Sequence, residues 1–272
     1  GREASPFIAY LRSLGIEPVV IAERGAADFG ALRGLAAALR EIAPHIVQSH
    51  GYRPTGLVSL LRLGRPSWRW IGFFHGATRQ DLKDRVYNRL NLLMLARAER
   101  LVVLSEEHRG WFAGMGDRVR IIHNAVLSLP PPPHPADFTT LRKPGTALIG
   151  VVARLSHEKG VDLAIAALAL LRSRDQEAAL AIAGDGPEEA ALSRQAEAAG
   201  LADRVHFLGR VADVGSLYRT LDCVMIPSRD GAEGLPNVLL EAISAGLPVV
   251  ATRVAAVPEV LVDEAAGLVV PP

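Results

Sequence analysis

The sequence predicts an α/β protein of two doubly wound domains, each a parallel sheet covered by helices. Short apolar runs alternate with longer helical patterns through most of the 272 residues. Continuous apolar runs are typical of parallel strands that are buried on both faces. The alternation stops at a proline cluster, Pro130–Pro133 followed by Pro135, and then starts again. Two domains also fit the length, because single domains are usually shorter.

In the first half, short apolar runs predict five strands and the stretches between them predict four helices. Ser105 is placed to cap the last of these helices. The predicted strands are Ile16–Ala22, His45–Ser49, Trp70–Phe74, Arg100–Leu104 and Val119–Ile122. The predicted helices are Asp28–Ile42, Pro54–Leu63, Asp81–Ala98 and Ser105–Ala113.

The proline cluster predicts a stiff, extended linker, because proline suits neither helix nor strand interiors. We therefore expect a first domain over residues 1–128, a linker over 129–144 and a second domain over 145–272. In the second domain the predicted strands are Ala147–Ala153, Ala178–Ala183, Arg204–Leu208, Cys223–Ile226 and Pro248–Ala251. The predicted helices are Gly160–Arg172, Pro187–Ala199, Val214–Thr220 and Pro236–Ala245.

Both ends of the sequence look incomplete. Gly1 stands where a strand should turn into a helix, and the chain stops at Pro272, directly after an apolar run. We therefore expect a fragment that lacks the first strand of one domain and the closing helices of the other. We expect no secretory leader, because the chain does not open with a basic patch followed by an apolar core. It holds no apolar run of the ~18 residues that a spanning helix needs. Its one cysteine, Cys223, excludes an internal disulfide and predicts a buried thiol in a cytoplasmic protein.

Charge is divided unevenly along the chain. From Gly1 to Lys143 there are 20 Lys and Arg against 12 Asp and Glu, a net +8, and the remainder carries 10 against 17, a net −7. A basic half indicates an anionic partner, such as the inner face of a membrane, that the protein contacts peripherally. The alternative is that both halves are simply solvated.

Two cations follow the first strand of the second domain. Arg154 and Lys159 lie in the predicted loop between that strand and the next helix. Ligands of doubly wound sheets bind at the carboxyl ends of the strands. An arginine fork, a lysine charge and a helix N-terminus together can hold a diphosphate and stabilise its charge as it departs. Alternatively, both residues are solvated surface cations.

Two further turns at strand ends are candidates for ligand contact. Gly184 and Gly186 flank Asp185 in a tight turn, where glycines let the backbone approach a ligand. Arg210 and Val211 follow the next strand and could flank a planar base. Alternatively, the turn at Asp185 only connects two elements.

The most informative segment runs from Pro227 to Ala242. Glu233 lies in its loop, and Glu241 lies in an otherwise apolar stretch of the helix that follows. A buried carboxylate needs hydrogen-bond donors, and a diphosphate would repel it, whereas a vicinal diol of a ribose or hexose donates two. We therefore assign both glutamates to sugar hydroxyls. Taken alone, Glu241 could equally be an acid on a helix surface.

This segment resembles the signature of retaining glycosyltransferases of the GT-B fold, the large group called glycosyltransferase family four. In that family two glutamates, separated by seven residues, flank a short turn; here the turn is Gly234-Leu235-Pro236-Asn237. The resemblance covers most of the chain. Segments similar to the family's other motifs are Gly150–Leu155 with Lys159-Gly160, Gly184–Pro187, Phe207–Gly209, Ala245–Ala251, Pro258-Glu259, Phe73–Gly76, Gly1–Glu3 and His123–Val126, where Ala125 replaces a glycine.

The resemblance implies two Rossmann-like domains that face each other across a cleft, and transfer of a hexose from a UDP- or GDP-sugar to a glycan or lipid-linked acceptor. Arg154 and Lys159 would neutralise the departing diphosphate, Glu233 would contact the transferred sugar, and Glu241 would hold the ribose. His75 would lie near the anomeric carbon, unless it is a core histidine. The donor-binding set is Gly184, Gly186, Arg210, Val211, Gly234, Leu235, Pro236, Asn237 and Glu241.

The family implies retention of anomeric configuration, a role in polysaccharide or lipopolysaccharide synthesis, and no metal or other cofactor. The sequence holds no evident metal-ligand cluster, and nothing in it indicates a nucleic-acid partner. Epimerases and phosphorylases share the architecture, but the segment from Glu233 to Glu241 argues against both. A dinucleotide oxidoreductase is disfavoured further, because no Gly-x-Gly-x-x-Gly follows a strand. A non-catalytic module that binds sugar nucleotides is the alternative from another class.

Overall fold

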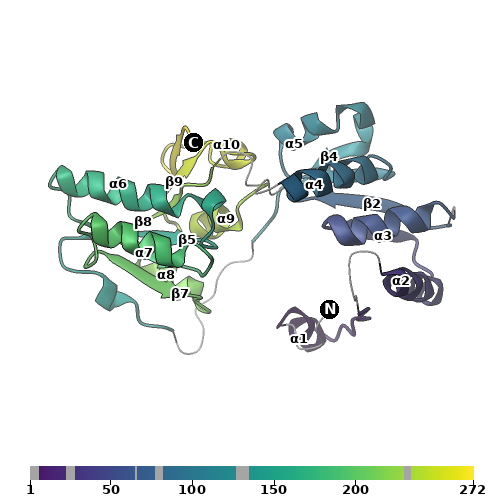
Figure 1. Ribbon diagram of the computed structural model, residues 1–272, viewed down its shortest axis with the longest axis horizontal. Helices are drawn as coiled ribbons and strands as arrows, with labels where there is room; N and C mark the ends of the chain where they lie inside the picture. Colours follow the sequence, from purple (N-terminus) through teal and green to yellow (C-terminus); the bar gives the residue numbers. More distant parts are fainter. Residues whose placement is uncertain (1–5, 23–27, 65, 77–81, 127–134, 230–233) are drawn as a thin grey trace. The chain divides into compact units, whose positions relative to one another are not determined.

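The computed structural model describes residues 6–22, 28–64, 66–76, 82–126, 135–229 and 234–272 (Figure 1). The chain divides into two compact units. Unit 1 comprises Gly1–Phe74, Val86–Val102 and Phe112–Arg120, and unit 2 comprises His75–Arg85, Val103–Trp111 and Ile121–Pro272. The segments that follow β2 and β3 of the first sheet therefore pack with unit 2. The predicted linker prolines from Pro130 to Pro133 lie outside the described residues.

The first sheet has four strands in the order β1-β2-β3-β4. β1 and β2 pair in parallel, with Ile46 opposite Arg69 and His50 opposite Phe73. The strands are β1 Ile46–His50, β2 Arg69–Phe74, β3 Arg100–Val103 and β4 Val119–Ile121. The helices along this part of the chain are α1 Pro6–Ser13, α2 Phe29–Ile42, α3 Tyr52–Arg62, α4 Leu82–Leu95, α5 Glu106–Trp111 and the 3-10 helix η1 Ala113–Arg118.

Local signals in the sequence explain where several of these elements begin. The Asp28 side chain accepts a hydrogen bond from the Gly30 amide and so caps α2. Ser105 accepts one from the His108 amide at 3.1 Å, which confirms the predicted cap of α5. Trp70 is fully buried in β2, and its indole donates to the Ser49 hydroxyl at 2.9 Å.

One predicted strand is wrong. Residues 16–22 belong to neither a helix nor a strand, and Ile16 and Val19 are 49% and 65% exposed. An apolar run forms a strand only where a neighbour pairs with its backbone, and within the described residues no strand lies beside this one. The remaining predicted strands and helices are present, with ends shifted by at most a few residues. Helix α1 was not predicted.

Unit 2 is built on six parallel strands in the order β10-β9-β8-β5-β6-β7. Counted from β5, this is the 3-2-1-4-5-6 order of a doubly wound sheet. The strands are β5 Ala147–Val152, β6 Ala178–Ala183, β7 Val205–Gly209, β8 Cys223–Ile226, β9 Val249–Thr252 and β10 Gly267–Val270. The helices are α6 Val161–Ser173, α7 Glu189–Ala198, α8 Val214–Thr220, α9 Asn237–Ser244 and α10 Val257–Val260, with 3-10 helices η2 Thr139–Leu141 and η3 His157–Lys159.

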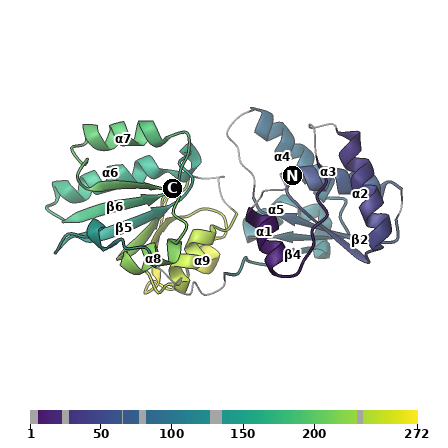
Figure 2. The same ribbon diagram turned by 90° about the horizontal axis from the view of Figure 1, so that it is seen from below.

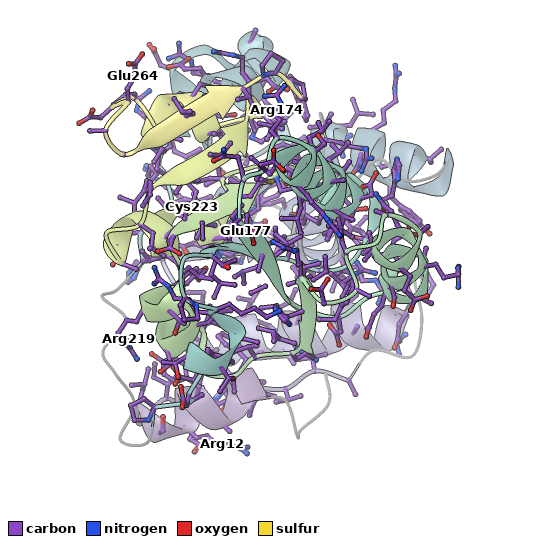
Figure 3. All side chains as sticks on the ribbon, turned by 90° about the vertical axis from the view of Figure 1, so that its left-hand side faces the viewer. Arg12, Arg174, Glu177, Arg219, Cys223 and Glu264 are labelled. Atoms are coloured by element: carbon purple, nitrogen blue, oxygen red, sulfur yellow. The ribbon has the colours of Figure 1, made fainter. Side chains whose placement is uncertain are left out.

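Helices cover both faces of this sheet. Figure 2 shows α6 and α7 on one face and α8 and α9 on the other. Two apolar clusters fill the layers: one includes Ile165 and Leu192 from α6 and α7, and the other includes Tyr218 and Leu239 from α8 and α9. Cys223, at the start of β8, is half-buried rather than fully buried (Figure 3). The order in which strands are added to the sheet reverses between β5 and β8, which is where doubly wound sheets bind ligands. The loops after these two strands are therefore placed to contact a ligand.

Candidate active site

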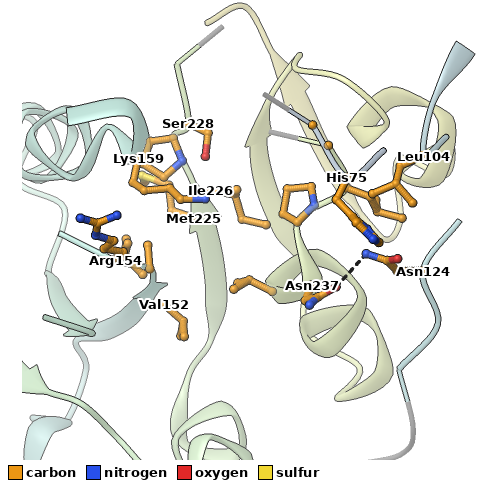
Figure 4. A pocket seen from close by; sticks show the side chains of 18 residues that line it. His75, Leu104, Asn124, Val152, Arg154, Lys159, Met225, Ile226, Ser228 and Asn237 are labelled. Atoms are coloured by element: carbon orange, nitrogen blue, oxygen red, sulfur yellow. Dashed lines mark hydrogen bonds between the residues drawn. The ribbon is translucent and has the colours of Figure 1, made fainter. Parts of the chain in front are cut away.

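A cavity of about 560 Å³ lies in unit 2 at the carboxyl ends of β5 and β8. Its size is that of a pocket for a small molecule or cofactor. Figure 4 shows Arg154 and Lys159 on one side of it and His75, Asn124 and Asn237 on the other. The structure thus brings together seven of the thirteen predicted site residues: His75, Arg154, Lys159, Gly234, Leu235, Pro236 and Asn237.

The two predicted cations enter the cavity from the loop after β5. Arg154 is exposed, and Lys159 is half-buried at the end of η3. Within the described chain no ion pair or side-chain hydrogen bond engages the guanidinium of Arg154. Gly160 then takes the left-handed conformation, with φ 64°, and caps α6. A side chain there would place Cβ 1.9 Å from the Pro227 carbonyl oxygen, so only glycine lets the β5 and β8 loops approach this closely.

The loop after β8 is fixed by an ion pair that sequence reasoning missed. Arg229 donates to both carboxylate oxygens of Asp162, at 2.9 and 2.6 Å, and its amide donates to the Glu158 carbonyl at 2.8 Å. Thr252 donates to the Ser228 carbonyl from the neighbouring strand. The hydrogen bond from Arg229 holds the pKa of Asp162 below its usual value. These contacts anchor the loop as far as Arg229. Glu233, the predicted sugar contact, lies outside the described residues.

The turn from Gly234 to Asn237 forms another wall. A Cβ on Gly234 would lie 2.1 Å from the His75 carbonyl oxygen, so glycine permits a close backbone approach. Leu235 is 5% exposed, Pro236 precedes α9, and Asn237 is the first residue of that helix. The N-terminus of α9 therefore borders the cavity, and its free amides favour anions or other acceptors.

Asn124 also lines the cavity, although the sequence did not single it out as a site residue. Its Nδ2 donates to Oδ1 of Asn237 at 3.1 Å. The neighbouring residue, His123, lies 3.2 Å from the Glu259 carboxylate, which also accepts from the Glu106 amide at 2.7 Å. The family-like segment His123–Val126 gave the signal for this contact, but only the packing shows which side chain faces the cavity.

Four predicted donor residues lie outside the lining of this cavity. Gly184 and Gly186 back the β5 loop instead, since a Cβ on either would lie 1.8 Å from the Ala153 oxygen or 2.3 Å from the Leu155 oxygen. Close packing between the loops after β5 and β6 therefore explains why both positions are glycine. Arg210 and Val211 follow β7 at the edge of the sheet, and the Arg210 side chain is 84% exposed and lies 3.9 Å from Asp185.

Glu241 also lies outside the cavity lining, one helical turn beyond Asn237. Its Oε2 accepts a hydrogen bond of 2.8 Å from the hydroxyl of Tyr218, which is fully buried in α8. Burial, and then the charge of Glu241, raise the pKa of Tyr218, so the phenol remains a donor.

No group of three His, Cys, Asp or Glu among the described residues is arranged to hold a metal ion. No helix within the described ranges is both long and apolar enough to cross a membrane.

Several solved structures share this fold. HepE from Anabaena, solved with UDP-glucose, superposes with a TM-score of 0.79 over 98% of this chain and 76% of its own, at 19% identity. A glycosyltransferase from Rickettsia africae gives a TM-score of 0.77 over 99% of this chain and 74% of its own, at 15% identity. The fold is therefore GT-B, with two parallel-sheet α/β domains.

The sequence comparisons identify the family within this fold. Residues 136–272 match the model of glycosyl transferases group 1, and residues 1–126 match that of glycosyltransferase family 4. The chain belongs to the group 1 glycosyl transferases of family 4, as the residues from Glu233 to Glu241 predict.

Curated relatives include two mannosyltransferases. One, of lipopolysaccharide core biosynthesis in Rhizobium leguminosarum bv. viciae, is 33% identical over 183 residues, which are 65% of this chain and 51% of the relative. The other, a GDP-mannose-dependent alpha-(1-6)-phosphatidylinositol monomannoside mannosyltransferase of Mycobacterium tuberculosis, is 39% identical over 126 residues, 44% of this chain and 33% of the relative. The chain thus spans about half or less of the length of these relatives.

Proposed function

We propose that the protein transfers a hexose, with retention of anomeric configuration, from a nucleoside diphosphate sugar to a glycan or lipid-linked acceptor. One observation carries this proposal: Arg154 and Lys159 enter the cavity at the β5 and β8 strand ends, opposite the turn that starts α9. Two cations suit a diphosphate, and the polar groups of the facing turn suit sugar hydroxyls. Family membership then directs this chemistry toward glycosyl transfer.

The donor in this proposal is a UDP- or GDP-sugar. HepE was solved with UDP-glucose, and the mycobacterial relative is GDP-mannose-dependent. Because these two proteins use different nucleotides, both UDP- and GDP-sugars are included in the test. Glu241, held by Tyr218, is assigned to the ribose diol, and Glu233 to the transferred sugar.

Charge development explains what the cations would do. As the bond from the anomeric carbon to the diphosphate oxygen breaks, its electron pair stays on the diphosphate, whose negative charge grows. Arg154 and Lys159 lower the energy of that charge as it forms. The acceptor hydroxyl oxygen bonds to the anomeric carbon, and its proton passes to the departing diphosphate. His75, which lines the cavity, is assigned to the sugar side of this step. The residues supply the chemistry without a metal or other cofactor.

The acceptor side of the proposal rests on charge and on the relatives. The excess of 20 Lys and Arg over 12 Asp and Glu up to Lys143 favours a cytoplasmic protein in peripheral contact with an anionic membrane face, where a lipid-linked acceptor would be presented. The relatives act in lipopolysaccharide core synthesis and on a phosphatidylinositol mannoside. Cell-envelope or polysaccharide synthesis is the corresponding setting.

A transfer assay with the full-length protein tests the catalytic assignment. Lys159→Ala and Glu233→Ala should each reduce transfer by at least ~100-fold, the usual loss when a group that stabilises a transition state is removed. Lys143→Ala, an exposed lysine outside the cavity, is the matched control for Lys159 and should leave transfer unchanged. Near-normal rates in either of the first two variants would remove the donor-site assignment.

A further inference from the structure

A second cavity, of about 640 Å³, lies in unit 1. It is at the edge of the sheet where the strands begin, opposite the edge where they end. It is lined by the residues with which three strands begin, Ile46, Arg69 and Arg100, and by Arg118, directly before β4. This is the amino-terminal edge of the sheet, whereas the loops that follow β2 and β3 leave the carboxyl edge. The cavity is therefore separate from the site described above.

Among the residues that the structure describes, five arginines and one acid line this second cavity. The arginines are Arg62, Arg69, Arg97, Arg100 and Arg118, and the acid is Glu99, so the formal charge is five positive against one negative. Charges of one sign that share a cavity repel one another and attract a counter-ion.

Both carboxylate oxygens of Glu99 already have partners within the protein. Its Oε1 pairs with Arg62, and its Oε2 accepts a hydrogen bond of 2.8 Å from the Trp70 amide. Arg62 also donates to the carbonyls of Pro66 and Trp68 and lies over the Trp68 ring. This arginine is thus part of the wall, held by the acid, and its charge is balanced.

The other four guanidinium groups have no carboxylate partner within the described chain. Arg100 and Arg118 donate only to the carbonyls of Glu99 and Ala98, at 3.0 and 3.1 Å, and a carbonyl does not balance their charge. Arg69 and Arg97 are exposed, and among the described residues neither side chain has an ion pair or hydrogen bond. Planar guanidinium forks match the oxygens of a phosphate group and bind it in pairs.

We propose that this arginine cavity is a second binding site, for a phosphate-bearing anion, independent of the donor site. A phosphate at this position balances charges that the protein itself leaves unbalanced. The phosphate belongs to either a phospholipid headgroup or a soluble phosphate compound. Both ligands present phosphate oxygens to Arg69 and Arg97. The experiment below distinguishes a phospholipid headgroup from a soluble phosphate compound.

The test uses full-length protein that carries Arg154→Ala with Lys159→Ala, so that the donor site contributes little to the binding of phosphate. Binding of inorganic phosphate is measured by calorimetry, and binding of phosphatidylglycerol and phosphatidylcholine vesicles by sedimentation. The variant is Arg69→Gln with Arg97→Gln. Its control, Arg33→Gln with Arg120→Gln, removes the same charge from exposed arginines of unit 1 outside the cavity.

The cavity variant should weaken binding by at least ~10-fold, at about 1 kcal/mol per residue, and the control by much less. Loss confined to phosphatidylglycerol vesicles identifies a headgroup, and loss with inorganic phosphate identifies a soluble ligand. Equal losses in both variants, or no loss in the cavity variant, would overturn the proposal. Arg69→Lys with Arg97→Lys keeps the charge without the fork and should give an intermediate loss, which guards against a folding defect in the glutamine variant.

Discussion

The hydroxyl of Tyr218 in α8 donates a 2.8 Å hydrogen bond to Oε2 of Glu241 in α9. The tyrosine is fully buried, so its ring fixes the position from which it donates. A carboxylate held by one oxygen keeps its other oxygen for a ligand. This contact gives Glu241 a defined direction, so in our proposal the carboxylate would lose less conformational entropy when it binds the ribose diol.

Tyr218→Phe should weaken the binding of the donor nucleotide by about 10-fold, because a hydrogen bond to a charged group contributes roughly 1.5–3 kcal/mol. Calorimetry with UDP and GDP measures the effect. Tyr10→Phe, which changes an exposed tyrosine of α1, is the control. If Tyr218→Phe bound both nucleotides within two-fold of the wild type, Tyr218 would not position the ribose contact.

Gly160→Ala should destabilise the protein severely. The substitution pairs an unfavourable φ of 64° with a Cβ 1.9 Å from the Pro227 carbonyl oxygen, and the backbone must move to accept it. We expect a loss of at least ~3 kcal/mol in the free energy of unfolding, measured in urea. Gly246→Ala has a similar φ, 74°, and open space around it, so it should cost only about 1–2 kcal/mol. Equal losses would contradict the close approach of the two loops.

Asp162→Asn should change how stability depends on pH. A carboxyl whose pKa is lower in the folded chain than in the unfolded chain stabilises the folded state above its ordinary value of 3.8, and this effect disappears as the pH falls through the lower folded value. Both partners of the pair are partly exposed, so we expect a difference of about 1 kcal/mol from the wild type at pH 7. Urea unfolding at pH 7, 5 and below 4 should show this difference shrink only at the lowest pH. A difference that did not vary with pH would rule out the ion pair as its source.

Glu259→Ala should remove an acceptor from the start of α5. The Glu259 carboxylate accepts from the Glu106 amide at 2.7 Å and lies 3.2 Å from His123. Loss of such a contact typically costs about 1–2 kcal/mol of the free energy of unfolding. Glu264→Ala, at an exposed acid nearby in the chain, should stay within about 0.5 kcal/mol of the wild type. Thermal or urea unfolding compares the two, and similar effects would argue against the contact.

The sequence predicted most of the fold because local periodicity and burial agree along most of the chain. Residues 178–183, 214–220 and 223–226 are apolar or helical in pattern, and each forms the expected element with the expected ends. Ile16–Ala22 shows the limit of this reasoning. Its pattern suits a strand, but strand formation depends on a neighbouring backbone, which sequence periodicity does not reveal.

The candidate site was predicted where the signal was local in the chain. Arg154, Lys159 and Asn237 follow strand ends, and a doubly wound sheet brings such positions together. Gly184 and Gly186 satisfy the same rule, but the structure shows them packed against neighbouring carbonyls. A glycine that approaches a ligand and a glycine that approaches another loop look alike in a sequence.

Long-range partners were not predictable from local patterns. Tyr218 and Glu241 are separated by 23 positions, and Asp162 and Arg229 by 67. Nothing in the composition of α8 or α6 marks the residue whose side chain contacts the later helix or loop. Such pairs follow from the order of the strands, which fixes which helices become neighbours.

The assignment of Arg154 and Lys159 to the donor diphosphate is tested by the binding of nucleoside diphosphate sugars. Thermal unfolding with UDP-, GDP- and ADP-sugars compares the wild type, Arg154→Ala with Lys159→Ala, and the matched control Lys143→Ala with Arg174→Ala. Ligand at 100 times its Kd adds about 2.7 kcal/mol of apparent stability. We expect a UDP- or GDP-sugar to raise the Tm of the wild type and of the control, and not that of the variant with Arg154→Ala and Lys159→Ala. The donor-site assignment would be wrong if no nucleotide sugar raised the Tm of the wild type. It would also be wrong if the Tm of the variant with Arg154→Ala and Lys159→Ala rose as much as that of the wild type.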